Sequence, residues 1–213
     1  MKGLFIKDLS LVTAKKSTYI LYFIIIAVLS ISGDSFFSLA YGMFLFGMVA
    51  ISTTAYDEMG GGMAYLMTLP VTARDYVAEK HLFCFLSSLL GFAASALFTI
   101  IASLTKGGAD QIFGSIADAV PMLFIYFGIS SVMIFVDIKA GIRKSRTVMI
   151  VIYAVIFSVV FALKNILGGR EEGIELGSEL SPLLLILIFA AAGGILFAVF
   201  YSLSLKAMKN KEY

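Results

Sequence analysis

The chain has 213 residues, of which 60% are apolar and 14% are charged, and its formal net charge is +2. A soluble domain of this length needs a larger polar share to cover its surface, so the composition excludes a soluble protein and predicts an integral membrane protein. The basic residues flank apolar runs, where they suit anionic lipid, and they give no indication of a nucleic-acid partner. The lone cysteine, Cys84, excludes an internal disulfide.

The first sixteen residues predict a helix that lies in the headgroup plane. One helical arc is formed by Met1, Leu4, Phe5, Leu9, Leu11 and Val12. The amphipathic pattern is imperfect, because Asp8 falls inside the apolar arc and Ile6 falls outside it. The alternative is a simple cytoplasmic segment that carries positive charge.

Six apolar runs follow, each close to the roughly 20 residues that a helix needs to cross a hydrocarbon core of about 30 Å. They cover residues 18–32, 35–55, 82–104, 116–136, 147–167 and 182–205. The first run is short unless Lys15 and Lys16 extend toward the interface. Continuous apolar runs disfavour a β-barrel, whose strands alternate apolar and polar residues. The sequence therefore predicts an all-α protein with one transmembrane domain over residues 1–213.

Lysine and arginine are distributed unevenly between the two sets of connecting segments, and cytoplasmic segments retain the excess. The richer set consists of both ends and the loops after the second and fourth spans. It holds Lys2, Lys7, Lys15, Lys16, Arg74, Lys80, Lys139, Arg143, Lys144, Arg146, Lys206, Lys209 and Lys211. The other set holds only Lys106, Lys164 and Arg170. We therefore expect both termini in the cytoplasm, which agrees with six crossings.

The longest outer segment, residues 168–181, carries four glutamates. They suit either solvated external charge or contact with a cationic cargo. Within the spans, small residues such as Gly42, Gly91 and Gly128 predict closely packed helices. We place no ionisable side chain near the bilayer midplane, where an ion-coupled carrier would be expected to keep one.

Recognisable catalytic chemistry is missing from the sequence. A metal site or a Ser-His-Asp triad needs partners for the single histidine, His81, and the pattern supplies none. No glycine-rich phosphate loop followed by lysine is present. We expect no catalytic, cofactor or metal site in this chain, so any ATP must be bound by another chain.

The loop between the second and third spans has a pattern of its own. Asp57 and Glu58 are expected to end the second span at the membrane surface, where their charges can be hydrated. Three glycines, Gly60, Gly61 and Gly62, then permit a sharp change of direction.

A short amphipathic helix is predicted after the glycines. Its apolar face consists of Met63, Leu66, Met67 and Pro70, and Tyr65 adds a polar-tipped aromatic ring. The Leu69-Pro70 pair ends this helix, because proline disfavours helix in the residue before it.

The third span is expected to project beyond the bilayer as a stalk. Thr72 and Asp75 have the spacing of a capping box, which predicts a helix start near Ala73. A helix from Ala73 to Leu104 would measure about 48 Å at 1.5 Å per residue, more than a bilayer core requires.

These residues resemble the permease subunits of type-2 ABC exporters, the ABC-2 family, particularly small six-span bacterial members associated with peptide export. The similarity lies in the opening residues 1–9 and in the run of Asp57, Gly61, Tyr65-Leu66, Leu69-Pro70-Val71, Arg74-Asp75-Tyr76-Val77 and Lys80. In that family the loop carries a coupling helix that sits in a cleft of a cytoplasmic ATPase. The departure is the triple glycine, which can loosen the start of the helix.

The resemblance implies a set of ATPase-coupling residues in this loop and at the start of the third span. They are Asp57, Glu58, Gly60, Gly61, Gly62, Tyr65, Leu66, Leu69, Pro70, Arg74, Asp75 and Lys80. Without the resemblance, residues 60–70 read equally well as a plain loop between two spans.

The function implied is that of a permease subunit, with no enzymatic activity of its own, in the bacterial cytoplasmic membrane. Its expected partners are two ATP-binding subunits, which hold ATP and Mg²⁺, and a second permease subunit, identical or related. The expected cargo is an amphipathic or hydrophobic molecule, such as a peptide, moved outward. The alternatives are a stand-alone immunity protein or small channel that meets no ATPase and, less in keeping with the residues, a membrane-embedded enzyme.

Overall fold

The computed structural model describes residues 2–14, 16–32, 35–106, 116, 119–141, 147–148, 151 and 182–211, and all regular structure in these ranges is helical. This confirms the predicted all-α class for the described residues. The elements in chain order are α1 (Lys2–Thr13), α2 (Lys16–Ser32), α3 (Ser35–Glu58), the 3₁₀ turn η1 (Met59–Gly61), α4 (Gly62–Thr68), α5 (Ala73–Lys106), the unlabelled helix Ala119–Gly141 and α7 (Pro182–Lys209).

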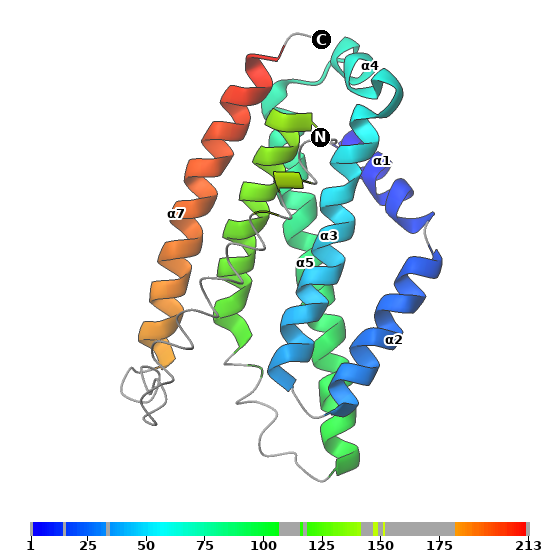
Figure 1. Ribbon diagram of the computed structural model, residues 1–213, viewed down its shortest axis with the longest axis vertical. Helices are drawn as coiled ribbons and strands as arrows, with labels where there is room; N and C mark the ends of the chain where they lie inside the picture. The colour runs from blue at the N-terminus through cyan, green and yellow to red at the C-terminus, as the bar shows by residue number, and fades with distance from the viewer. Residues whose placement is uncertain are drawn as a thin grey trace.

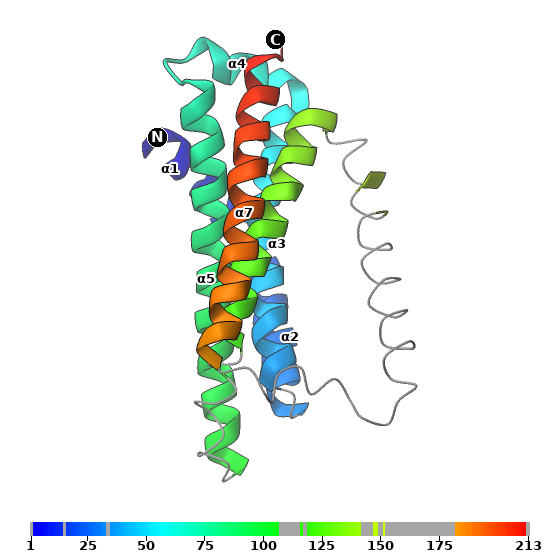
Figure 2. The same cartoon turned by 90° about the vertical axis from the view of Figure 1, so that its left-hand side faces the viewer.

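The long helices run side by side along the longest axis of the molecule (Figures 1 and 2). Helix α1 departs from this direction, since its axis meets that of α2 at 71°. Helices α1 and α4 and the C-terminal end of α7 lie toward the same end of the bundle (Figure 1). Every part of the candidate site described below belongs to this end.

Four helices in the described part of the chain are long and apolar enough to cross a membrane: α3, α5, Ala119–Gly141 and α7. The bent pair α1 and α2 becomes a fifth if it is counted as one broken span. Helix α2 alone has 17 residues. The predicted span 147–167 and the acidic segment 168–181 lie outside the described residues, apart from positions 147, 148 and 151. The chain is thus a multi-pass membrane protein, while six crossings and cytoplasmic termini stay predictions.

Helix α3 is the central element of the bundle. In its most apolar stretch 61% of the residues are buried inside the protein, against 6% for α7. The main apolar core lies at the α4 end and takes side chains from α1, α3, α4, α5, Ala119–Gly141 and α7. Elsewhere α2, α5 and α7 expose large apolar side chains, which suits contact with lipid.

Glycines allow the helices to approach one another closely, as the small residues in the spans predict. A Cβ atom at Gly91 of α5 would collide with the carbonyl oxygen of Gly42 in α3. At a second crossing, a Cβ atom at Gly193 of α7 would collide with the carbonyl oxygen of Phe124. Backbone carbonyls cannot rotate away as flexible side chains can, so these two contacts require glycine.

Neighbouring glycines of α7 provide a matched test of this packing. Gly193→Ala should destabilise the protein by about 1–3 kcal/mol, because the added methyl group forces two backbones apart. Gly194→Ala should be neutral or slightly stabilising, because a Cβ atom there meets nothing within 4 Å. Thermal unfolding of both variants in detergent measures the difference, and equal melting temperatures would show that this crossing is looser than described.

Candidate functional site

The turn between α3 and α4 depends on one of the three glycines. Gly61 has a φ of 77°, in the left-handed region that residues with a side chain rarely adopt. Gly62 already belongs to α4, and a Cβ atom there would lie 2.8 Å from the carbonyl oxygen of Asp57. The predicted sharp change of direction is therefore confirmed, and it occurs at Gly61.

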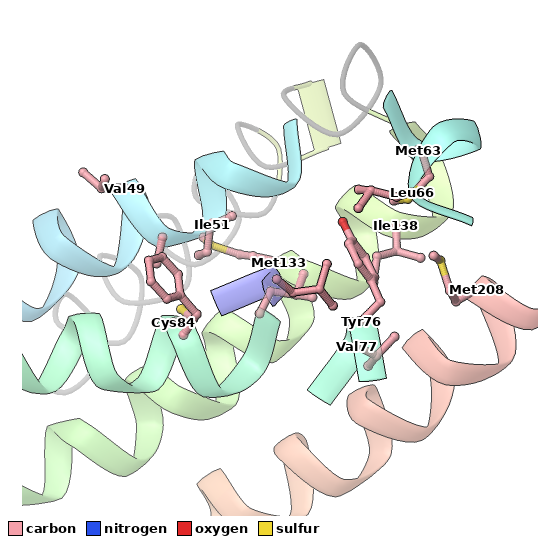
Figure 3. Close-up of a cluster of buried hydrophobic side chains, with 14 of the residues drawn as sticks. Val49, Ile51, Met63, Leu66, Tyr76, Val77, Cys84, Met133, Ile138 and Met208 are labelled. Atoms are coloured by element: carbon pink, nitrogen blue, oxygen red, sulfur yellow. The ribbon is translucent and has the colours of Figure 1, made fainter. Parts of the chain in front are cut away.

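The seven residues of α4 divide into an inner and an outer face. Met63 and Leu66 are buried and lie together with Tyr76, Ile138 and Met208 (Figure 3). Leu66 therefore supports the position of α4 on the bundle and offers little surface to a partner molecule in this structure.

The outer face of α4 carries Tyr65, which is 69% exposed, and Leu69, also exposed, follows the helix. The helix ends at Thr68, and Leu69 is already extended, as the proline at position 70 predicts. Pro70 is also exposed. Of the predicted apolar face, Met63 and Leu66 are buried in the core, while Pro70 lies outside it.

The capping box at the start of α5 is confirmed. The Asp75 amide donates to Thr72 Oγ1 at 3.1 Å, and the Thr72 hydroxyl donates to Asp75 Oδ2 at 2.6 Å. The Thr72 amide donates to the same carboxylate at 3.3 Å. Helix α5 begins at Ala73 and has 34 residues, so the length predicted for the third span is also confirmed. Arg74, in its first turn, is exposed.

The environment of Asp57 differs from the predicted one, because its side chain is buried and forms ion pairs. It is only 5% exposed, and its Oδ2 atom lies 2.7 Å from Nζ of Lys80. The Tyr76 hydroxyl donates to the same oxygen at 3.1 Å, and Lys7 pairs with Oδ1. The expectation of a hydrated charge was wrong because α1 and α5 cover this end of α3 and supply its counter-charges.

Asp8, the residue that interrupted the apolar arc of α1, is also buried. It pairs with Lys80 of α5 and lies 3.1 Å from Nζ of Lys7. The Thr53 hydroxyl donates to Asp8 Oδ2 at 2.9 Å, and Lys80 donates to Thr53 at 2.9 Å. A lone acidic residue on the inner face of an amphipathic helix was the sequence signal for this pairing.

Lys7, Asp8, Asp57 and Lys80 thus form one charge cluster that joins α1, α3 and α5. Burial disfavours the charged form of Lys7, but its hydrogen bond to Asp57 and the neighbouring carboxylates outweigh this effect and raise the pKa of Lys7. Its ammonium group therefore remains charged at neutral pH.

Glu58 and the C-terminal segment meet beside the cluster. Oε1 of Glu58 lies 2.7 Å from Nζ of Lys211. Gly141, with a φ of 72°, ends its helix close to this carboxylate, because a Cβ atom there would lie 3.3 Å from Oε2. The ends of two further elements, the helix Ala119–Gly141 and the segment after α7, thereby lie next to α4.

A groove of about 690 Å³ opens between α1 and α4. It is mostly apolar and is lined by Gly3, Leu4, Lys7, Leu11, Tyr56, Asp57, Gly62, Tyr65, Leu66, Leu69, Pro70 and Val71. Two members of the charge cluster, Lys7 and Asp57, therefore border the same groove as the outer face of α4.

Among the described residues, no group of three His, Cys, Asp or Glu side chains is arranged to hold a metal ion. His81 is buried, donates from Nδ1 to the Val77 carbonyl at 2.8 Å and packs against Phe197 and Tyr201. Cys84 is also buried in the apolar core. Both residues contribute to packing, and the absence of catalysis in this chain stays a prediction.

The charge cluster predicts unequal effects for its two lysines. Lys80→Met should destabilise the protein by about 3–5 kcal/mol, because it leaves two buried carboxylates short of their shared counter-charge. Lys7→Met should lower the free energy of unfolding by about 1 kcal/mol or less, because the Lys7 side chain is partly exposed and Lys80 still pairs with Asp57. Thermal unfolding in detergent compares the variants. If Asp8→Asn does not reduce the effect of Lys80→Met, the pairing between these residues is refuted.

Two searches, one of curated proteins and one of solved structures, gave no significant match to the chain. A family model described as ABC-2 family transporter protein matches residues 3–209, which covers nearly the whole chain and includes α1, α4 and the charge cluster. The chain therefore belongs to the ABC-2 transporter family and is a membrane protein of that family.

Proposed function

We propose that the chain is the membrane-spanning permease subunit of an ATP-driven exporter and that α4 receives the movement of the ATP-binding subunit. The observation that carries the proposal is the division of α4 into two faces. Met63 and Leu66 pack into the core, while Tyr65 and the following Leu69 are left exposed at the end of the bundle. A short helix of this kind can bind a partner on one side and remain packed on the other.

Movement of α4 would pass directly into two long helices. Helix α4 follows α3 through the turn at Gly61, and four residues separate its end from the capped start of α5 at Ala73. Packed interfaces do not deform continuously, so displacement of α4 would favour a change in how whole helices pack. The charge cluster would transmit the displacement to α1, because Asp57 and Lys80 both pair with side chains of that helix.

The partners follow from this role. Two ATP-binding subunits would hold ATP and Mg²⁺, and a second permease subunit, identical or related, would complete the pathway in the bacterial cytoplasmic membrane. We propose outward transport of an amphipathic or hydrophobic cargo such as a peptide. The exposed apolar side chains of α2, α5 and α7 support this cargo class, and no enzymatic activity is assigned to the chain itself.

The role of α4 can be tested by adding charge to its exposed side only. The double variant Tyr65→Asp and Leu69→Asp should reduce co-purification of a P-loop ATP-binding protein about tenfold or more, because it places carboxylates in an apolar contact. The measurement is quantitative mass spectrometry of the tagged chain purified from its own cells. Ser10→Asp on an exposed position of α1 is the control and should leave the yield unchanged.

Leu66→Asp separates folding from binding in the same experiment. Leu66 is buried, so this substitution should lower the stability of the permease itself. If the double variant still co-purifies with the ATP-binding protein at the wild-type level, α4 is not the contact. If the wild-type chain captures no ATP-binding protein, the stand-alone membrane protein becomes the better interpretation.

A further inference from the structure

Glu79 of α5 is a buried carboxylate without a counter-charge of its own. It is 2% exposed, and neither carboxylate oxygen has a hydrogen-bond partner among the residues that the structure describes. Lys7 and Lys80, the lysines of the neighbouring charge cluster, are already shared by Asp8 and Asp57. Three carboxylates therefore lie beside the two ammonium groups of the cluster. An ionised buried carboxylate requires compensation, so Glu79 must take up either a proton or a cationic ligand.

A pocket of about 300 Å³ adjoins Glu79 between α1 and α5. It is lined by Lys2, Phe5, Ile6, Glu79 and Leu82, so one acidic and one basic residue stand among apolar ones. The exposed lining of the pocket is apolar, because the carboxylate oxygens of Glu79 are covered as the side chains stand, so a ligand must displace part of the lining to reach them.

The pocket lies where the charged first turns of α5 give way to its apolar part. No charged residue occurs from Leu82 to Thr105. Leu82, Leu86 and Leu90 follow Glu79 at intervals of three and four residues, which places them on one face of the helix. All three leucines are exposed. A row of exposed apolar side chains thus extends from the pocket along the membrane-spanning part of α5.

We propose that this pocket binds the headgroup of an aminophospholipid. The primary ammonium would donate to Glu79, the phosphate would face Lys2, and an acyl chain would follow Leu82, Leu86 and Leu90. An ammonium group has three N–H donors, whereas the methylated choline headgroup has none, so the site should discriminate between them. This proposal does not depend on the transport role, since the lipid is a resident ligand of the chain.

The experiment compares two lipids on the whole chain. The protein is exchanged into mixed micelles that hold equal amounts of phosphatidylethanolamine and phosphatidylcholine, and native mass spectrometry counts the lipid that remains bound. The wild type should retain phosphatidylethanolamine about tenfold more than phosphatidylcholine, the scale of a charge-assisted hydrogen bond. Glu79→Gln should abolish the preference, while Glu172→Gln, the same change at another glutamate of the chain, should preserve it.

Leu82→Lys provides a second variant if Glu79→Gln fails to fold. It places an ammonium group of the protein next to Glu79, so the lipid preference should also disappear. Equal retention of the two lipids by the wild type would overturn the proposal and would mean that a proton or another cation neutralises Glu79. A preference for phosphatidylethanolamine that survives both Glu79→Gln and Leu82→Lys would overturn it as well.

Discussion

The α4 end of the bundle depends on the two ion pairs that Lys80 makes inside the protein with buried carboxylates. Asp8 reaches Lys80 from α1, and Asp57 reaches it from the last turn of α3. Ions of this kind tolerate little displacement, because loss of a partner exposes the full penalty of a buried charge. The cluster therefore specifies how α1, α3 and α5 sit relative to one another, at the place where α3 continues into α4.

Helix α4 combines a packed inner face with a break in the helical backbone at each of its ends. A left-handed glycine, Gly61, precedes it, and an extended Leu69 with Pro70 follows it, so neither neighbouring helix continues through it. Its inner face nevertheless packs on the common apolar core. A helix arranged in this way can move as a unit with the core beneath it, which suits the proposed transfer of movement from an ATP-binding subunit.

The α4 end of the bundle and the membrane-spanning part of the helices have different chemistry. Large apolar side chains on α2, α5 and α7 are exposed along the spans, and the buried charges of Asp8, Asp57, Glu79 and Lys80 are confined to the α4 end. Charge thus organises the end where a partner and a lipid headgroup are proposed to bind, while glycine contacts organise the spans.

The sequence by itself determined the features that depend on neighbouring residues: the apolar runs, the end of α4 before Pro70 and the start of α5 at Ala73 by the capping of Thr72 and Asp75. Helical periodicity and caps act over a few positions, so they can be read from one segment. Only the tertiary structure decided that Asp57 is buried, that Leu66 faces the core and that Asp8 pairs with Lys80, 72 positions away. The counter-charge of a buried residue comes from whichever helix packs against it, and that partner is set by packing in three dimensions.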